Sequence, residues 1–210
     1  MAVGREEAVR WLELLQKVYT ENRQSLTELD SAIGDADHGI NMDRGFTAVK
    51  AELVSRPPID IHSVFQTAAT NLIRHVGGAA GPLYGTFFLR AAAVCAGKAE
   101  IGPADAIALF EAGIAGVQQR GKAVAGDKTM LDALLPALEA MRKTVAEGGG
   151  LAAILDAGTA AAHAGMLATI PMQARKGRAS YLGARSIGHQ DPGATSAYLL
   201  LKAAAETWRS

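Results

Sequence analysis

Apolar residues recur every three or four positions through most of the chain, a spacing that places them on one face of an α-helix. The first segment is typical, with Ala8, Leu12, Leu15 and Tyr19 at this spacing. Glycines and prolines interrupt the pattern at intervals, and no segment shows the clear alternation expected of a β-strand. The pattern predicts eight helices, near residues 5–29, 41–55, 61–76, 82–97, 103–120, 130–146, 151–168 and 194–208.

Composition supports a helical fold. The chain is rich in alanine and only 5% aromatic, which favours helices that approach each other closely over a sheet. A length of 210 residues suits one sizeable core, and no repeat or linker divides the sequence. The predicted fold is therefore all-α: a single domain over residues 1–210, built as an antiparallel bundle or barrel of eight helices.

Charge and cysteine content limit which binding partners and which kinds of site the chain can have. Lys plus Arg and Asp plus Glu both number 21, so no net field favours nucleic acid or an anionic membrane. The single Cys95 excludes an internal disulfide and a cysteine metal site. The N-terminus carries acidic residues and no long apolar run, so it does not resemble a signal peptide. The uncharged stretch 157–174 contains Pro171 and is interpreted as a core helix. We expect a cytoplasmic protein.

The connections between the predicted helices fall into two chemical groups. In an antiparallel bundle, alternate connections lie at the same end. Those after the first, third, fifth and seventh predicted helices are residues 30–40, 77–81, 121–129 and 169–193, and they hold the unusual residues. The other connections are ordinary turns. This segregation predicts that one end of the molecule is a functional site.

Three aspartates, Asp30, Asp35 and Asp37, lie close together in the segment LDSAIGDADHGIN. Residues five apart point roughly 140° away from each other on a helix, so Asp30 must end one element and the others must follow on a loop. In an extended stretch, positions two apart point the same way, and Asp35 and Asp37 can converge. Such carboxylates repel each other and suit a hard cation such as Mg²⁺. A solvated acidic turn is the alternative.

Two other segments are chemically suited to phosphate. Small residues in GGAAGP, 77–82, precede a predicted helix, where backbone amides can approach an anion; a helix end followed by a tight turn is the alternative. The segment 169–193 places several basic residues among glycines, and arginine matches pairs of phosphate oxygens. A solvated basic loop is the alternative there, although loops this long are usually functional. GDKTM, 126–130, is also explained by Asp127 or Thr129 capping the next helix.

Four motifs carry a family resemblance. GDADHGINMDRGF, VGGAAGPLYGTFF, RGKAVAGDKTMLDAL and MQARKGRASYLGARSIGHQDPGATS closely resemble, in this order, the nucleotide-binding L subunits of bacterial dihydroxyacetone kinases. The resemblance spans essentially the whole chain and implies a barrel of eight antiparallel helices with nucleotide bound at one end. It implies that Asp30, Asp35 and Asp37 hold two Mg²⁺ ions that bridge the phosphates of tightly bound ADP or ATP.

The same resemblance implies a set of nucleotide contacts, with Arg178 as the catalytic side chain beside the phosphates. Ala80 stands where relatives often have serine, so one hydroxyl hydrogen bond would be missing. The implied contact residues are His38, Gly39, Ile40, Asn41, Ala79, Ala80, Gly121, Met130, Arg178, Asp191, Pro192 and Gly193.

The implied activity is a phosphotransferase, in which positioning and charge neutralisation provide most of the catalysis. The γ-phosphate of the bound nucleotide passes to dihydroxyacetone held covalently on a separate K subunit. An M subunit of the phosphotransferase system, carrying phosphohistidine, then rephosphorylates ADP in place. The separate chain and the DADHG form of the first motif favour this type over fused, ATP-dependent kinases.

Two other functions stay open at this point. One is an ADP-loaded sensor module that signals to a transcription factor. The other is a subunit of an ATP-dependent kinase acting on a related triose or tetrose, because the sugar would be bound elsewhere. The oligomeric state is open too, a homodimer included.

Overall fold

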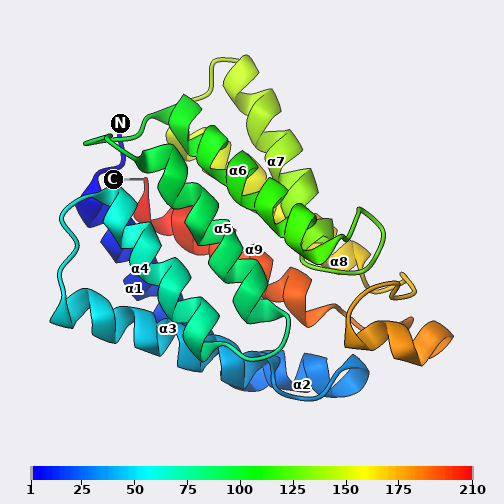
Figure 1. Ribbon diagram of the computed structural model, residues 1–210. Coiled ribbons are helices and arrows are strands. Elements are labelled where there is room, and N and C mark those ends of the chain that lie inside the picture. Colours follow the sequence, from blue (N-terminus) through cyan, green and yellow to red (C-terminus); the bar gives the residue numbers. More distant parts are fainter. Residues whose placement is uncertain (1, 210) are drawn as a thin grey trace.

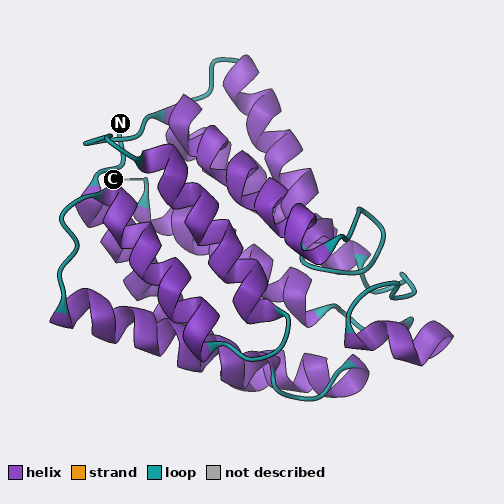
Figure 2. Cartoon of the chain, viewed as in Figure 1, coloured by secondary structure: helices purple, strands orange, loops and turns teal. Residues whose placement is uncertain are grey.

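The computed structural model describes residues 2–209, and these are almost entirely helical (Figure 1 and Figure 2). The described residues contain no strand, only an isolated antiparallel bridge between Val3 and Ile101. The helices are α1 Arg5–Glu21, α2 Arg23–Ile33, α3 His38–Ser55, α4 Ile61–His75, α5 Ala80–Cys95, α6 Pro103–Gly121, α7 Leu131–Ala146, α8 Leu151–Ala168, the 3₁₀-helix η1 Arg178–Ser186, and α9 Pro192–Thr207.

Eight of the helices form a closed ring. Going round the ring, α1 packs against α3, and each helix from α3 to α8 packs against the next one in sequence. α9 packs against both α8 and α1, which closes the barrel. Consecutive helices of the ring run antiparallel, as expected for this fold class, and their connections are short except for the long segment between α8 and α9. The predicted all-α barrel of eight antiparallel helices is therefore confirmed, with α2 and η1 as additions at one end.

The first predicted helix, 5–29, has the wrong boundaries. The structure breaks it at Asn22 into α1 and α2, because the Asn22 side chain donates a hydrogen bond to the carbonyl of Val18 at 2.8 Å. Asparagine competes in this way with the helical backbone bonds. Beyond the break, α2 continues to Ile33 and carries Asp30 in its last turn.

Aromatic side chains fill the inside of the ring. Trp11 of α1 packs against Trp208 just beyond α9, with ring centroids 4.8 Å apart, and against Phe88 of α5 at 5.6 Å. The Trp11 Nε1 donates to the carbonyl of Leu200 at 3.1 Å, which satisfies its polar group in the interior. These contacts join helices from both ends of the sequence and hold the ring closed.

The apolar helix α8, Leu151–Ala168, has the length and composition expected of a membrane span, and 39% of its residues are buried. Core helices of soluble proteins have the same properties, so this is weak evidence for a span. α8 packs against α7 and α9 as a member of the ring. The helix predicted at 151–168 is confirmed. The uncharged stretch 157–174, interpreted as a core helix, runs past its end, and Pro171 lies in the turn that follows.

Candidate functional site

Four helices, α3, α5, α7 and α9, begin at the same end of the barrel. The first residues of α3, α5 and α9, and Met130 just before α7, line one pocket. The pocket has a volume of about 860 Å³ including its open mouth. A helix N-terminus carries a partial positive charge and unpaired amides, so four of them together favour an anion. Residues from the predicted loops 30–40, 77–81, 121–129 and 169–193 all line this pocket, as expected from the alternation of connections.

The three aspartates converge in this pocket. One oxygen of each carboxylate, from Asp30, Asp35 and Asp37, lies within 4.8 Å of the others. The convergence was predicted, but the expected extended backbone was wrong: Ala36 has a left-handed conformation, with φ of 60°. Asp30 is buried at the end of α2 and accepts the amides of Asp37 at 2.9 Å and His38 at 3.1 Å. Asp30 therefore folds the loop back so that the other carboxylates join it.

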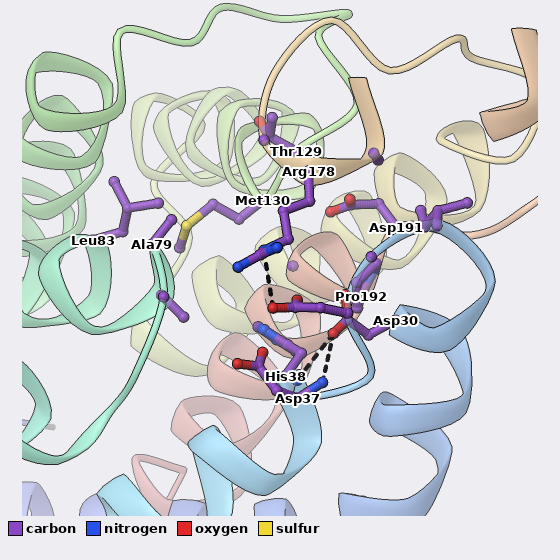
Figure 3. A pocket seen from close by; sticks show the side chains of 18 of the residues that line it. Asp30, Asp37, His38, Ala79, Leu83, Thr129, Met130, Arg178, Asp191 and Pro192 are labelled. Atoms are coloured by element: carbon purple, nitrogen blue, oxygen red, sulfur yellow. Dashed lines mark hydrogen bonds and ion pairs between the residues drawn. The ribbon is translucent and has the colours of Figure 1, made fainter. Parts of the chain in front are cut away.

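The donor set of this cluster fits a hard divalent cation. Three carboxylates offer only oxygen ligands, which Mg²⁺ prefers, and leave coordination positions for phosphate and water. Arg178, at the start of η1, brings the nearest basic group, its Nε lying 2.9 Å from Oδ2 of Asp35. Figure 3 shows Arg178 pointing from η1 toward the carboxylates. The cluster thus combines cation ligands with a guanidinium that can bind phosphate oxygens.

The first turn of α3 supplies further polar groups. The Nε2 of His38 lies 2.9 Å from the hydroxyl of Ser196, which in turn lies 2.7 Å from the Tyr84 hydroxyl. Burial lowers the pKa of His38, against the opposing effect of Asp30 and Asp37. A neutral imidazole is therefore favoured, and it suits hydrogen bonding rather than charge.

Four residues of the implied nucleotide set lie in that turn, and two of them line the pocket: His38 and Asn41. Gly39 is buried and faces α2 rather than the pocket. A Cβ at this position would lie 2.0 Å from the carbonyl oxygen of Arg23. Its visible role is to allow α3 to approach α2. Ile40 is 39% exposed and lies outside the lining. A direct contact of these two residues with a nucleotide stays a prediction.

The loop before α5 is open to an anion. Gly78 has a φ of 63°, a conformation that favours glycine, and the helix starts two residues later at Ala80. Within residues 2–209, no side chain caps the first amides of this helix. Both Ala79 and Ala80 line the pocket. Small side chains and uncapped amides at a helix start are the usual features of a phosphate site.

A second, mostly apolar hollow adjoins the first and shares Ala79 and Met130 with it. Gly121, at the end of α6, and Val117 line only this second hollow, whereas Leu83 lines both. The two hollows together present a charged part and an apolar part. They suit a ligand that is polyanionic at one end and flat and apolar at the other.

The DPG segment forms both a helix start and a pocket wall. Asp191 caps α9 by accepting the amide of Ala194 at 2.7 Å, and Pro192 is the first helical residue. Burial raises the pKa of Asp191 to about 7, although its bond to the Ala194 amide and the charge of Lys128 act in the opposite direction. Asp191, Pro192 and Gly193 all line the pocket, so this helix start also belongs to the site.

Sequence reasoning missed Lys128 in the GDKTM segment and Asp132 just after it. Of the two expected caps, the Thr129 hydroxyl accepts the first amide of α7, that of Leu131, at 3.2 Å, whereas Asp127 accepts the amide of Val124 within the loop. The Asp132 carboxylate holds the loop itself by accepting the amides of Gly126 at 2.5 Å and Thr129 at 2.7 Å. Lys128 is buried to 1% exposure and lines the pocket. The only available signal was a lysine beside an aspartate in a glycine-bounded turn, which is too common to be informative.

Fold and site together define a class: a closed helical barrel with a candidate site for a polyanion and a hard cation at one end. The chain belongs to the DAK2 domain family, which matches residues 32–206. It is 43% identical over 202 residues to the phosphoenolpyruvate-dependent dihydroxyacetone kinase, ADP-binding subunit DhaL, of Escherichia coli K12, covering 96% of each chain. It is 41% identical over 208 residues to the corresponding subunit of kinase 1 from Listeria innocua, covering 99% of this chain and 98% of that one.

A solved structure has the same fold. The dihydroxyacetone kinase of C. freundii, in complex with AMP-PNP and Mg²⁺, matches with a TM-score of 0.72 and 25% identity. The match covers 98% of this chain and 34% of that one, so this chain spans about a third of that kinase. The resemblance inferred from the four motifs is confirmed, and this chain has the length of the separate ADP-binding subunits.

Proposed function

We propose that this chain is the ADP-binding subunit of a phosphoenolpyruvate-dependent dihydroxyacetone kinase, a phosphotransferase that acts in the cytoplasm. The observation that carries the proposal is the convergence of three carboxylates with four helix N-termini in one pocket. Carboxylates repel phosphates, so these two features serve a single ligand only when cations lie between them. Relatives of the same length at 41–43% identity bear this function in their names.

In this proposal the carboxylates of Asp30, Asp35 and Asp37 hold two Mg²⁺ ions. Bound Mg²⁺ and ATP would supply the transferable phosphate and the positive charge that neutralises its oxygens. The uncapped amides at Ala79 and Ala80 bind phosphate oxygens along the dipole of α5. The contacts proposed from the family resemblance complete the set: His38, Gly39, Ile40, Asn41, Gly121, Met130, Arg178, Asp191, Pro192 and Gly193.

The apolar hollow receives the base. Met130 and Ala79 line both hollows, and Leu83 does so as well. Apolar side chains exclude water from a flat ring and let it stack, while the charged pocket holds the other end of the ligand. Gly121 lies beside this space at the end of α6, where it leaves room for the base.

Arg178 is the proposed catalytic residue. Its Nε lies 2.9 Å from Asp35, so the guanidinium is already at the edge of the cation site. A planar guanidinium donates two parallel hydrogen bonds to phosphate oxygens. It can therefore follow negative charge as that charge shifts during transfer, which is the largest source of catalysis in reactions of this kind.

Two partner subunits complete the cycle. A K subunit presents dihydroxyacetone at the open mouth of the pocket, and an M subunit carrying phosphohistidine restores the phosphate to retained ADP. Three carboxylates, two cations and Arg178 would hold the diphosphate tightly. Such retention suits a nucleotide that is recharged in place, because an exchanging kinase would be limited by slow ADP release.

The test is reconstitution with a K subunit and dihydroxyacetone. We expect free ATP to support about one turnover per chain, limited by ADP release, and phosphoenolpyruvate with the phosphorelay proteins to sustain turnover. Continuous turnover on ATP alone, at the rate of the relay, would instead identify an exchanging ATP-dependent kinase. A chain that retains ADP but transfers no phosphate from either donor would be a sensor module.

A further inference from the structure

Lys128 joins the loop before α7 to the segment that carries Arg178. Its Nζ donates to three backbone carbonyls, those of Met172 at 3.0 Å, Ser186 at 2.6 Å and His189 at 2.6 Å. All three acceptors belong to the segment 169–191 between α8 and α9. The lysine itself is 1% exposed, so the bonds form away from solvent.

The three acceptors match the ammonium group in number. A protonated lysine has three N–H donors and no acceptor, and each of them here has one carbonyl partner. Burial lowers the pKa of Lys128, an effect that the nearby negative charge of Asp191 opposes. A buried cation is tolerated when hydrogen bonds and opposite charge compensate its lost hydration, and both compensations are present.

The acceptors lie at the two ends of the Arg178 segment. Met172 precedes Arg178 by six positions and Ser186 ends η1, so Lys128 brings together the base of the loop. The other hydrogen bonds at this base join uncharged backbone groups, so each is weaker than a bond from the charged ammonium. The amide of Arg175 donates to the Asp127 carbonyl at 3.0 Å, and that of Gly188 donates to Ile170 at 2.8 Å.

The contacts of the Lys128 ammonium hold its backbone in a conformation that lysine does not favour locally. Its φ is 63°, a left-handed conformation that long side chains rarely adopt. The tertiary contacts of the residue must maintain this conformation. The ammonium and its three carbonyls are the contacts that direct the side chain into the interior.

We propose that Lys128 is a positioning residue: its ammonium closes the base of the Arg178 loop and thereby fixes the guanidinium over the phosphate site. This inference rests on the proposed function for the role of Arg178. The three hydrogen bonds of the Lys128 ammonium all go to backbone carbonyls of the loop. A shift of about 1 Å in a catalytic group can cost about 100-fold in rate, so loosening this loop should slow transfer strongly.

The test compares two variants with a matched control. Lys128→Met keeps the apolar stem and removes the ammonium. Lys128→Gly also removes the ammonium, but glycine adopts the left-handed backbone without strain. This variant therefore separates loss of the ammonium from misfolding. The control is Lys122→Met, because Lys122 also has a positive φ, 51°, yet its side chain is exposed.

Two measurements are made on full-length nucleotide-loaded protein. Hydrogen exchange should become at least tenfold faster at the amides of Arg175 and Gly188 in both Lys128 variants, and stay unchanged in α5. In single-turnover assays with ATP and the K subunit, the transfer rate should fall about 100-fold, while the ATP concentration for half-maximal rate changes far less. Lys122→Met should match the wild type in both measurements.

Three outcomes would overturn the inference. They are unchanged exchange at Arg175 and Gly188, an equal rise of exchange throughout the chain, or an unchanged transfer rate. The exchange readout does not depend on kinase activity. If wild-type protein transferred no phosphate, the proposed function would fail, while exchange would still decide whether Lys128 holds the loop.

Discussion

Neutralising one carboxylate of the cluster should stabilise the ligand-free protein. In Asp37→Asn, the shape is kept and two like-charge pairs, with Asp30 and Asp35, are removed. With the carboxylate oxygens within 4.8 Å of one another, each pair costs about 1 kcal/mol at the dielectric constant of water. Loss of the favourable interaction with the α3 dipole, about 0.5 kcal/mol, and of attraction to Arg178 offsets part of this gain. We expect a net gain of about 1 kcal/mol, or about 2–4 °C in Tm.

The same variant should lose the response to ligand. A ligand that binds only the folded state at a concentration 100-fold above its Kd stabilises by about 2.7 kcal/mol. Wild-type protein should show a shift of this order with Mg²⁺ and ADP together, and little with ADP alone. Asp37→Asn should show almost none, since a cation ligand is missing. Chemical denaturation with and without each ligand measures both effects on protein first freed of nucleotide.

The control for both effects is Glu13→Gln, which neutralises an exposed acid on α1. It should change stability by less than about 0.5 kcal/mol and keep the full ligand shift. If Asp37→Asn lowers the stability of the ligand-free protein, the carboxylates do not repel each other as argued. If it retains the full shift with Mg²⁺ and ADP, the assignment of Asp37 as a cation ligand is wrong.

Three further predictions follow from particular contacts. Arg178→Ala should slow phosphate transfer by about 10²–10³. Arg185, an exposed residue at the end of η1, serves as comparison, and Arg185→Ala should have a small effect. The reverse order in a transfer assay would mean that Arg178 is the wrong assignment. Gly165→Ala should lower the free energy of unfolding by about 1–3 kcal/mol, because its Cβ would lie 2.1 Å from a backbone oxygen of α7, whereas Gly150→Ala meets nothing within 4 Å and should be neutral. Cys95 is buried and its pKa is raised to about 12, so near neutral pH a disulfide reagent should label it only after unfolding.

The ring of helices was predictable because its signals are local. Apolar periodicity and the glycines and prolines between segments mark α4 to α8 with small errors in their ends. The break at Asn22 was not predictable, since asparagine in a helix is common and only its bond to Val18 shows the effect. Likewise α3 begins at His38 rather than near 41, because Asp30 binds amides seven and eight residues later.

The site was predictable as far as residue type carries its chemistry. Three aspartates in one loop and a glycine-bounded helix start are enough to indicate a cation and an anion. Lys128 could not be found in this way, because its partners are backbone carbonyls, which every residue has. Gly39 shows the limit from the other side: its contact with a nucleotide, implied by the resemblance, stays a prediction, while its packing against α2 could be found only from the structure.

The most direct test of the site is a crystal structure of the protein with ADP and Mn²⁺ in place of Mg²⁺, with anomalous scattering used to locate the metal. The account predicts anomalous peaks bonded to oxygens of Asp30, Asp35 and Asp37 and to the diphosphate, with the adenine in the hollow beside Gly121 and Met130. Mn²⁺ bound elsewhere, or ADP bound outside the pocket formed by the starts of α3, α5, α7 and α9, would contradict it.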